Sequence, residues 1–232
     1  MTRSVVLDIE GTTSPLGYVQ EHLFPYARRR IAAWLRRSDP AVDEVVEQVR
    51  TSLALPAGSR EQVAEVLCRW TDQDRKEAPL KTLQGLIWQA GFASGELVAR
   101  VYDDVPPTLR SWSARGLRLY VYSSGSVLAQ QLWFQHTQHG DLRGLFRGHF
   151  DLDGAGPKRD PASYRAISRL IGVEPAAAVY LSDVRAELDA AADAGWRAVG
   201  VRRPDNAGCD VGDHPAVAAL DEFAPDREAA WS

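Results

Sequence analysis

Two carboxylates follow a short apolar run at the start of this chain. The run covers residues 5–7, and Asp8 and Glu10 come after it, ahead of the Gly-Thr-Thr segment 11–13. If a strand continued through both acids, their side chains would share a face and could bind a divalent cation or act as a nucleophile with an acid–base partner. The hydroxyls and N–H groups of segment 11–13 could hold an anion. The alternative is an ordinary strand end with solvated acids.

Two serines and a lysine occupy similar places further along the chain. Ser123 and Ser124 follow a strand predicted at 117–122 and begin a helix, where hydroxyl and N–H groups bind phosphate oxygens. Such serines also serve as plain helix caps. Lys158 follows the Gly-rich segment 154–157, so its ammonium could reach the same edge of a sheet. A loop lysine is more commonly a solvated charge.

A further carboxylate, Asp183, follows the apolar run 178–181, and Glu187 and Asp189 come in the helix predicted after it. Carboxylate oxygens suit Mg²⁺, although Asp183 could simply cap the helix. Because the carboxyl ends of parallel strands meet at one edge of a sheet, we expect Asp183 to lie near Asp8.

The composition is that of an ordinary globular protein. The chain has 232 residues, of which 45% are hydrophobic, enough to fill a sizeable core. Its net charge of −4 and pI of about 5.8 argue against nucleic acid as a partner, because phosphate-backbone binding needs clustered positive charge. No apolar segment is long enough to cross a bilayer, and the first strand begins too early for a signal peptide. Cys68 and Cys209 have no metal-ligand neighbours, which fits a reducing compartment. We therefore expect a cytoplasmic protein with no membrane partner.

Strands and helices alternate in the second half of the chain. Apolar runs bounded by turn residues predict strands at 117–122, 148–151, 178–181 and 198–201, in addition to the first one. Helices are predicted between them at 127–138, 160–171 and 185–194. This alternation predicts an α/β fold with a doubly wound parallel sheet.

A long helical segment separates the first strand from the second. It is far longer than an ordinary crossover connection, and its apolar residues recur at helical spacing. We therefore predict a helical cap at 17–100, inserted into an α/β core made of residues 1–16 and 101–232. From Asn206 onwards we expect a loop, a weak helix and a tail.

Taken together, these signals resemble a known enzyme superfamily. A carboxylate pair, a hydroxyl, a lysine and a further carboxylate follow successive strands in the order found in haloacid dehalogenase-type phosphotransferases. The second acid is usually Asp in that superfamily, and here it is Glu10. With this glutamate, the Asp-Ile-Glu-Gly-Thr-Thr segment 8–13 resembles the enolase-phosphatase (acireductone synthase) family of methionine salvage. Other segments resemble the same family, namely 23–28, 74–76, 80–85, 122–126, 156–158, 181–183 and 187–191.

The resemblance implies a role for each strand end. Asp8 would be the nucleophile that attacks phosphorus, and Lys158 would neutralise both this carboxylate and the phosphate. Ser123 or Ser124 would bind the phosphate. Asp8 and Asp183 would hold one Mg²⁺ ion per chain.

The resemblance also implies a substrate. This is 2,3-diketo-5-methylthiopentyl-1-phosphate, which is enolised and then dephosphorylated to the acireductone 1,2-dihydroxy-3-keto-5-methylthiopentene. Glu10 is expected to join the Mg²⁺ site, through its backbone carbonyl, and to transfer a proton to the leaving oxygen. Lys81 is expected to bind the carbonyls or the phosphate from the helical cap. The base for enolisation stays open between Glu10 and a cap residue, and the family implies a monomer.

Three other functions compete with this interpretation. A phosphatase of the superfamily could act on another small phosphate ester without an enolase step. A hydrolytic dehalogenase would use Asp8 to attack carbon, but it needs no metal, so Glu10 and Asp183 count against it. A phosphoester-binding module without catalysis would have no need for the nucleophile, the lysine and the metal acids together.

Overall fold

The computed structural model describes residues 3–53 and 58–225. The chain forms two compact units, one made of Met1–Tyr18 with Ala99–Ser232 and the other of Val19–Val98. We call them the core unit and the helical unit and describe each by itself. Each boundary between the two units differs by two residues from the boundary predicted from sequence. The first lies after residue 18 instead of 16, and the second after residue 98 instead of 100.

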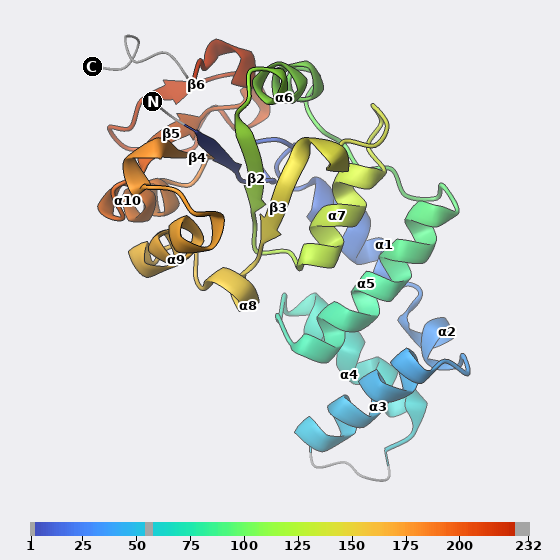
Figure 1. The fold of residues 1–232 in the computed structure, drawn as a ribbon. Coiled ribbons are helices and arrows are strands. Elements are labelled where there is room, and N and C mark those ends of the chain that lie inside the picture. The colour runs from blue at the N-terminus through green and yellow to red at the C-terminus, as the bar shows by residue number, and fades with distance from the viewer. Residues whose placement is uncertain (1–2, 54–57, 226–232) are drawn as a thin grey trace. The chain divides into compact units, whose positions relative to one another are not determined.

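Within the described residues, the core unit is built on a six-stranded parallel sheet (Figure 1). The strands lie in the order β3, β2, β1, β4, β5, β6, and every neighbouring pair is parallel. Their bounds are β1 Ser4–Leu7, β2 Arg118–Tyr122, β3 Phe146–Phe150, β4 Ala178–Ser182, β5 Arg197–Val201 and β6 Ala216–Val217. The chain thus starts in the middle of the sheet and winds outwards in both directions, which confirms the predicted doubly wound α/β fold.

The central strands are apolar because both faces of the sheet are covered. Every residue of β1 and β4 is buried, whereas the residues of β3, at the edge, are all partly or fully exposed. A parallel strand with helices on both sides has no solvent face, so its sequence is a continuous apolar run. This is why the first and fourth strands could be recognised from sequence.

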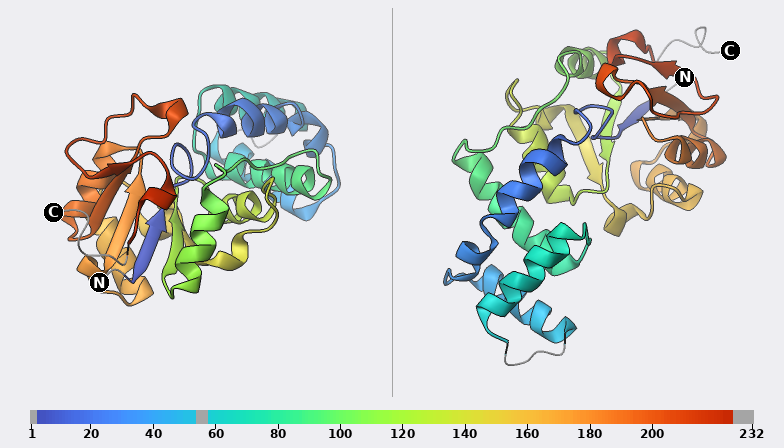
Figure 2. Two further views of the ribbon diagram at one scale, coloured as in Figure 1. Left: turned by 90° about the horizontal axis from the view of Figure 1, so that it is seen from above. Right: turned by 180° about the vertical axis from the view of Figure 1, so that it is seen from behind.

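Helices connect the strands and cover both faces of the sheet. They are α6 Val105–Ala114, α7 Val127–Gln135, α8 Leu152–Ala155, α9 Pro161–Ile171 and α10 Arg185–Asp193. With right-handed crossovers, connections that run towards β3 lie on one face and those that run towards β6 lie on the other. By this rule α6 and α7 lie opposite α9 and α10, an arrangement that can be followed from two further sides in Figure 2.

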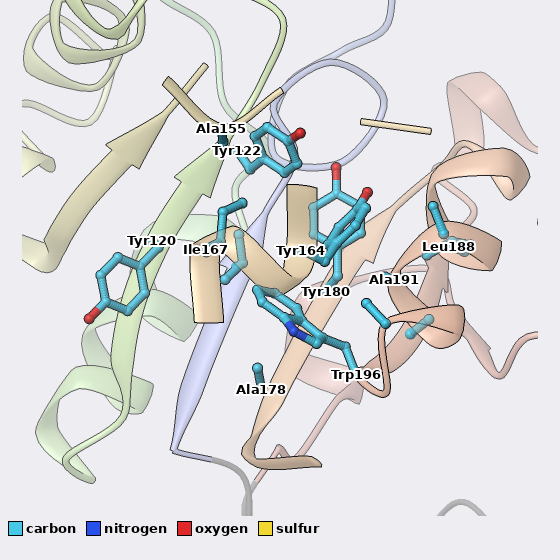
Figure 3. Packing of buried hydrophobic residues seen from close by; sticks show 14 of the residues in the cluster. Tyr120, Tyr122, Ala155, Tyr164, Ile167, Ala178, Tyr180, Leu188, Ala191 and Trp196 are labelled. Atoms are coloured by element: carbon cyan, nitrogen blue, oxygen red, sulfur yellow. The ribbon is translucent and has the colours of Figure 1, made fainter. Parts of the chain in front are cut away.

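An aromatic cluster fills the space between the sheet and α9 (Figure 3). The rings of Tyr122 and Tyr180, from β2 and β4, lie 5.6 and 5.2 Å from the ring of Tyr164 on α9, measured between centroids. Trp196 packs edge-on against Tyr164 at 5.5 Å. In Figure 3 the three tyrosine hydroxyls point towards the end of the sheet where the strands finish. The cluster is therefore apolar at its base and offers polar groups at the carboxyl edge.

The helical unit contains a π-helical turn, Val19–Leu23, followed by a series of α-helices. These are α1 Phe24–Arg28, α2 Ile31–Leu35, α3 Pro40–Ser52, α4 Arg60–Asp72 and α5 Ala78–Ala93. Asp39 caps α3 by accepting a hydrogen bond from Ala41 N, and Ser59 and Gln62 form a capping box on α4. In the described part of both units, no helix combines the length and the apolar character needed to cross a bilayer.

The helix predicted at 127–138 is too long by three residues. α7 ends at Gln135, and His136 leaves the helical conformation with φ −117° and ψ 41°. The following segment pairs with other backbone instead, because Thr137 forms isolated bridges with Ala99 and Gly140. This pairing is a tertiary contact that an apolar pattern along the sequence does not reveal.

The end of the chain also departs from the prediction. β6 was not predicted, since a two-residue strand carries no alternation pattern, and it is formed by pairing with β5. Short 3₁₀ turns at Pro204–Asn206 and Leu220–Glu222 take the place of the weak helix. The last part of the predicted tail, 226–232, lies outside the described residues.

Candidate active site

The carboxyl ends of β1, β2 and β4 lie side by side. Leu7, the last residue of β1, is level with Val121 of β2 and with Leu181 of β4. The residues that follow these strands therefore leave the sheet at one edge, where parallel α/β sheets carry their binding sites. Asp8 and Asp183 both stand at this edge.

The chain turns sharply after Asp8. The backbone N–H groups of residues 12–14 all donate to the carbonyl of Ile9, and Thr13 Oγ1 donates to the carbonyl of Asp8 at 3.1 Å. Ile9 N donates to Asp8 Oδ1 at 2.8 Å. Gly11 has φ +70°, a left-handed conformation that glycine adopts without a steric penalty. The turn thus fixes both the backbone and the carboxylate of Asp8.

This turn removes the condition on which one expectation about Glu10 rested. The shared face of Asp8 and Glu10 required the strand to continue, but β1 ends at Leu7 and Glu10 instead forms a backbone bridge with Ser14. Strand alternation therefore does not govern the direction of the Glu10 side chain. Its backbone carbonyl belongs to the same loop as Asp8.

Lys158 forms an ion pair with Asp8 inside the protein. The ammonium Nζ lies 2.8 Å from Asp8 Oδ1 and 2.7 Å from Oε2 of Glu187, and all three side chains are nearly buried. Burial raises the pKa of Asp8 to about 7, against the opposing attraction of Lys158. Burial alone would lower the pKa of Lys158, but attraction to Asp8 and Glu187 outweighs it and the pKa is raised. Lys158 is therefore the fixed positive charge of the site.

The aromatic cluster holds the loop that carries Lys158. Tyr164 donates its hydroxyl to the carbonyl of Lys158, and Tyr122 donates to the carbonyl of Gly156, both at 2.7 Å. Gly156 has φ +98°, so the loop uses a backbone conformation that favours glycine. These contacts explain why the hydroxyls of Tyr122 and Tyr164 face the carboxyl edge in Figure 3. A Gly-rich segment before a lysine was the visible sequence signal.

Glu187 is a site residue that the sequence interpretation left without a role of its own. Its Oε2 accepts from Tyr180 at 2.9 Å and lies 3.0 Å from Ser182 Oγ, in addition to the contact with Lys158. The neighbouring candidate Asp189 is half-exposed and pairs with His214 at 2.8 Å. Glu187 lies in the first turn of α10, next to the end of β4, whereas Asp189 lies further along the helix.

Asp183 is held from two sides. Asn206 Nδ2 donates to its Oδ2 at 2.8 Å, and a Cβ on Gly11 would overlap its carboxylate, so the backbone of Gly11 lies against it. Its Oδ1 is buried and has no hydrogen-bond partner in the described structure. Burial raises the pKa of Asp183. A buried oxygen with free lone pairs is the feature expected where a cation is to bind.

The two serines differ in their surroundings. Ser123 is buried at the end of β2, whereas Ser124 is exposed. Gln130, itself buried, donates its Nε2 to the carbonyls of Gly125 and Phe150 at 2.7 and 2.8 Å. This amide therefore ties the serine turn to the neighbouring strand. Gln130 was not recognised from sequence, since an apolar helix pattern gives no sign of such a contact.

Lys81 lies on α5, in the helical unit, and is partly buried. This position does not test the expected contact of Lys81 with substrate, which stays a prediction. The residues that the core unit does bring to one edge are Asp8, Lys158 and Asp183, with Glu187 and Asn206 as additions.

The donor set at this edge fits Mg²⁺ in chemistry. The available ligands are carboxylate and carbonyl oxygens, which are the groups that this hard cation takes. Within the described residues, no cluster of three or more His, Cys, Asp or Glu side chains could enclose a metal ion. A cation here would thus use the two carboxylates of Asp8 and Asp183, a backbone carbonyl and water, and Mg²⁺ characteristically keeps several waters.

Comparisons with known proteins show which family this chain resembles. A family model of haloacid dehalogenase-like hydrolases matches residues 2–195. A protein from Frankia alni named Enolase-phosphatase E1 is 55% identical over 223 residues, which cover 95% of this chain and 94% of that protein. A protein of the same name from Saccharopolyspora erythraea is 54% identical over 227 residues, covering 95% of each chain.

Solved structures show the same fold. The UTR4 protein of Saccharomyces cerevisiae superimposes with a TM-score of 0.84 at 31% identity, covering 96% of this chain and all of the other. CbbY from Rhodobacter sphaeroides, in complex with phosphate, gives a TM-score of 0.63 at 19% identity, with 96% of each chain covered. The second similarity is evidence for the fold alone.

Proposed function

Because this chain belongs to the haloacid dehalogenase-like hydrolases and, within them, to the enolase-phosphatase E1 family, we propose that it enolises and then dephosphorylates a small phosphorylated diketone. The substrate is 2,3-diketo-5-methylthiopentyl-1-phosphate, and the products are the acireductone 1,2-dihydroxy-3-keto-5-methylthiopentene and phosphate. The observation that carries the proposal is the buried ion pair between Lys158 and Asp8 at the carboxyl edge of the sheet.

Asp8 is the nucleophile of the phosphatase step. Its carboxylate attacks phosphorus in line, the bond from phosphorus to the ester oxygen breaks, and an aspartyl phosphate forms. Water then attacks phosphorus, which releases phosphate and restores the carboxylate. The turn after Asp8 supports this role, because it fixes the attacking group before substrate binds.

Lys158 holds the phosphate and the nucleophile together. Two like charges, a carboxylate and a phosphate, must approach each other, and the ammonium between them offsets the repulsion. When Asp8 becomes an acyl phosphate it loses its carboxylate charge, and Glu187 then remains as the counter-charge of Lys158. The buried hydroxyl of Ser123 and the backbone N–H of the neighbouring Ser124 complete the phosphate site.

Asp8, Asp183 and the backbone carbonyl of Glu10 would hold one Mg²⁺ ion. Mg²⁺, when bound, would lower the pKa of Asp8 and stabilise negative charge on the diketone oxygens and the phosphate. The unpartnered Oδ1 of Asp183 and the oxygen-only donor set support this assignment.

The remaining roles are assigned by chemistry. Glu10 gives a proton to the leaving oxygen, and its longer side chain alters its reach relative to the usual Asp. Glu10 or a residue of the helical unit removes the proton in the enolase step. Lys81 binds the carbonyls or the phosphate from the predicted helical cap, residues 17–100. We further propose that the enzyme works as a monomer in the cytoplasm.

The order of the two products tests the proposal. The diketo phosphate is mixed with the protein and Mg²⁺, the enol is followed by its ultraviolet absorbance, and released phosphate is measured in parallel. We expect the enol to appear before phosphate and both signals to stop when a chelator removes the metal. Phosphate release without an enol would indicate a phosphatase for another ester, and full turnover in chelator would indicate metal-independent chemistry.

A further inference from the structure

We propose that Asn206 is a positioning residue that orients the Asp183 carboxylate so that one oxygen is left for the metal, an inference that rests on the Mg²⁺ site proposed above. The two oxygens of this carboxylate are unlike. Oδ2 accepts a 2.8 Å hydrogen bond from Asn206 Nδ2, whereas Oδ1 is buried and has no hydrogen-bond partner within the described residues. The amide therefore occupies one oxygen and leaves the other for a cation.

The position of Gly11 strengthens this asymmetry. The backbone of Gly11 lies so close to the Asp183 carboxylate that a Cβ there would overlap it. A partial rotation of the carboxylate about its terminal torsion would take Oδ2 away from the amide of Asn206. Such terminal torsions are otherwise broad, so a free carboxylate would sample many orientations. Asn206 and Gly11 together restrict it to one.

Asn206 is itself held in place by the residues just before it. Arg203 is almost fully buried, and its Nε donates to the carbonyl of Thr12 at 2.8 Å. The same guanidinium pairs with Asp104 at 2.8 Å. Next to it, Tyr102 donates its hydroxyl to Asp205 at 2.7 Å. The segment that carries the amide is thus anchored at three points, one of them in the Asp8 loop.

This arrangement joins two parts of the proposed metal site. The segment after β5 contacts the loop after β1 through Arg203 and the loop after β4 through Asn206. Partners that orient metal ligands in this way commonly change metal affinity by 10-fold to 100-fold when they are removed. Asn206 should act on affinity in the same manner, without touching substrate.

The test is a titration of the metal-free protein with Mg²⁺ by isothermal calorimetry. Asn206→Leu removes the donor at nearly constant size, and Asn206→Ala leaves space for a water in its place. Tyr102→Phe is the control, since it removes the neighbouring bond to Asp205 and leaves the amide of Asn206 unchanged. Asn206 is only partly buried, so we expect both variants to fold. The melting temperature of each metal-free protein checks this.

We expect Asn206→Leu to weaken Mg²⁺ binding about 10-fold or more, Asn206→Ala less, and Tyr102→Phe less than twofold. Equal affinity in wild type and Asn206→Leu would overturn the positioning role while the metal site stands. An equal loss of Mg²⁺ affinity in Tyr102→Phe would also overturn the positioning role, since the affinity would then depend on the whole segment and not on the amide of Asn206. A wild-type protein that binds no Mg²⁺ would remove the proposed metal site and this inference with it.

Discussion

Lys158 and Asp8 form a buried ion pair, with 2.8 Å between Nζ and Oδ1, and the same ammonium lies 2.7 Å from Glu187. The lysine thus serves two carboxylates that are almost fully removed from water. Buried charges are stable only when they are paired, so each member of this group depends on the others.

Replacing the lysine should therefore show a characteristic pH dependence. Lys158→Met leaves Asp8 and Glu187 without their cation, and breaking a buried pair in this way costs about 3–5 kcal/mol of unfolding free energy. The pKa of Asp8, already raised to about 7 by burial, should rise further. When the pKa of a carboxyl is higher in the folded state than in the unfolded state, the unfolding free energy of the protein falls as pH increases above the unfolded-state pKa.

We accordingly expect Lys158→Met to be destabilised more at pH 8 than at pH 5, where the folded carboxyl keeps its proton. Urea unfolding at the two pH values, with wild type beside it, measures the difference. A loss of stability that is equal at both pH values would mean that the two carboxylates do not depend on Lys158.

Tyr180 should matter through the hydroxyl that it donates to Glu187. Ser182 Oγ lies within reach of both Glu187 and Asp8, at 3.0 and 3.4 Å, but it has a single proton to donate. Tyr180→Phe removes one of the three donors to Glu187 and leaves Lys158 and Ser182, and we expect it to cost about 1–2 kcal/mol of stability and to lower kcat several-fold.

Tyr120→Phe is the matched control for this change. Tyr120 belongs to the same buried cluster, but its hydroxyl points away from the other tyrosines (Figure 3). Denaturant unfolding and steady-state kinetics of the two variants are compared. Similar kcat values for Tyr180→Phe and Tyr120→Phe would argue against a role for the hydroxyl of Tyr180.

Gly11 should tolerate no side chain. Its φ of +70° disfavours other residues, and a Cβ would overlap the carboxylate of Asp183. We expect Gly11→Ala to lower kcat/KM by about 100-fold or more, since displacement of a reacting or metal-binding group by 1 Å has effects of that size.

Gly116→Ala separates the backbone effect from the site effect. Gly116 has φ +83°, and a Cβ there would meet no atom within 4 Å. This variant should lose about 1 kcal/mol or more of stability from strain and keep its activity. If Gly11→Ala keeps comparable activity, the close approach of Gly11 to Asp183 has no catalytic importance.

Gln130 should affect phosphate binding through the serine turn. Gln130→Leu leaves the carbonyl of Gly125 without its donor, while the carbonyl of Phe150 keeps the N–H of Ser123, and we expect a higher KM for the phosphorylated substrate with a smaller change in kcat. The unpaired, partly buried carbonyl of Gly125 should also cost about 1 kcal/mol of stability.

Gln138→Leu provides a comparison that does not involve the serine turn. The Gln138 amide bonds the backbone N–H and carbonyl of Val101, so its loss leaves similar groups unpaired. It should lower stability without altering KM. An unchanged KM in Gln130→Leu would show that the serine turn does not need this support.

Much of this fold could be predicted because parallel strands buried on both faces are continuous apolar runs. The runs that became β1 and β4 are of this kind, and the polar residues after them lie at the predicted edge. β6 could not be predicted, since its two residues pair with β5 through backbone groups that any sequence possesses.

The parts of the site that the sequence did not reveal depend on side chains from separate loops. Glu187 could be placed on a helix, but its pairing with Lys158 depends on how α10 packs on the sheet. Asn206 reaches Asp183 from a loop 23 residues further along the chain. The shared face considered for Asp8 and Glu10 required a strand through both residues, and a turn closed by hydrogen bonds to Ile9 ended the strand first.

The most direct test of the account is to trap the phosphoryl group on the protein. Enzyme and diketo phosphate are mixed with Mg²⁺, quenched in acid within one turnover, digested and examined by mass spectrometry. We predict one phosphoryl group on the peptide that contains Asp8, and none in Asp8→Asn. A phosphoryl group on another residue, or turnover by Asp8→Asn at the wild-type rate, would contradict the assignment of Asp8 as the nucleophile.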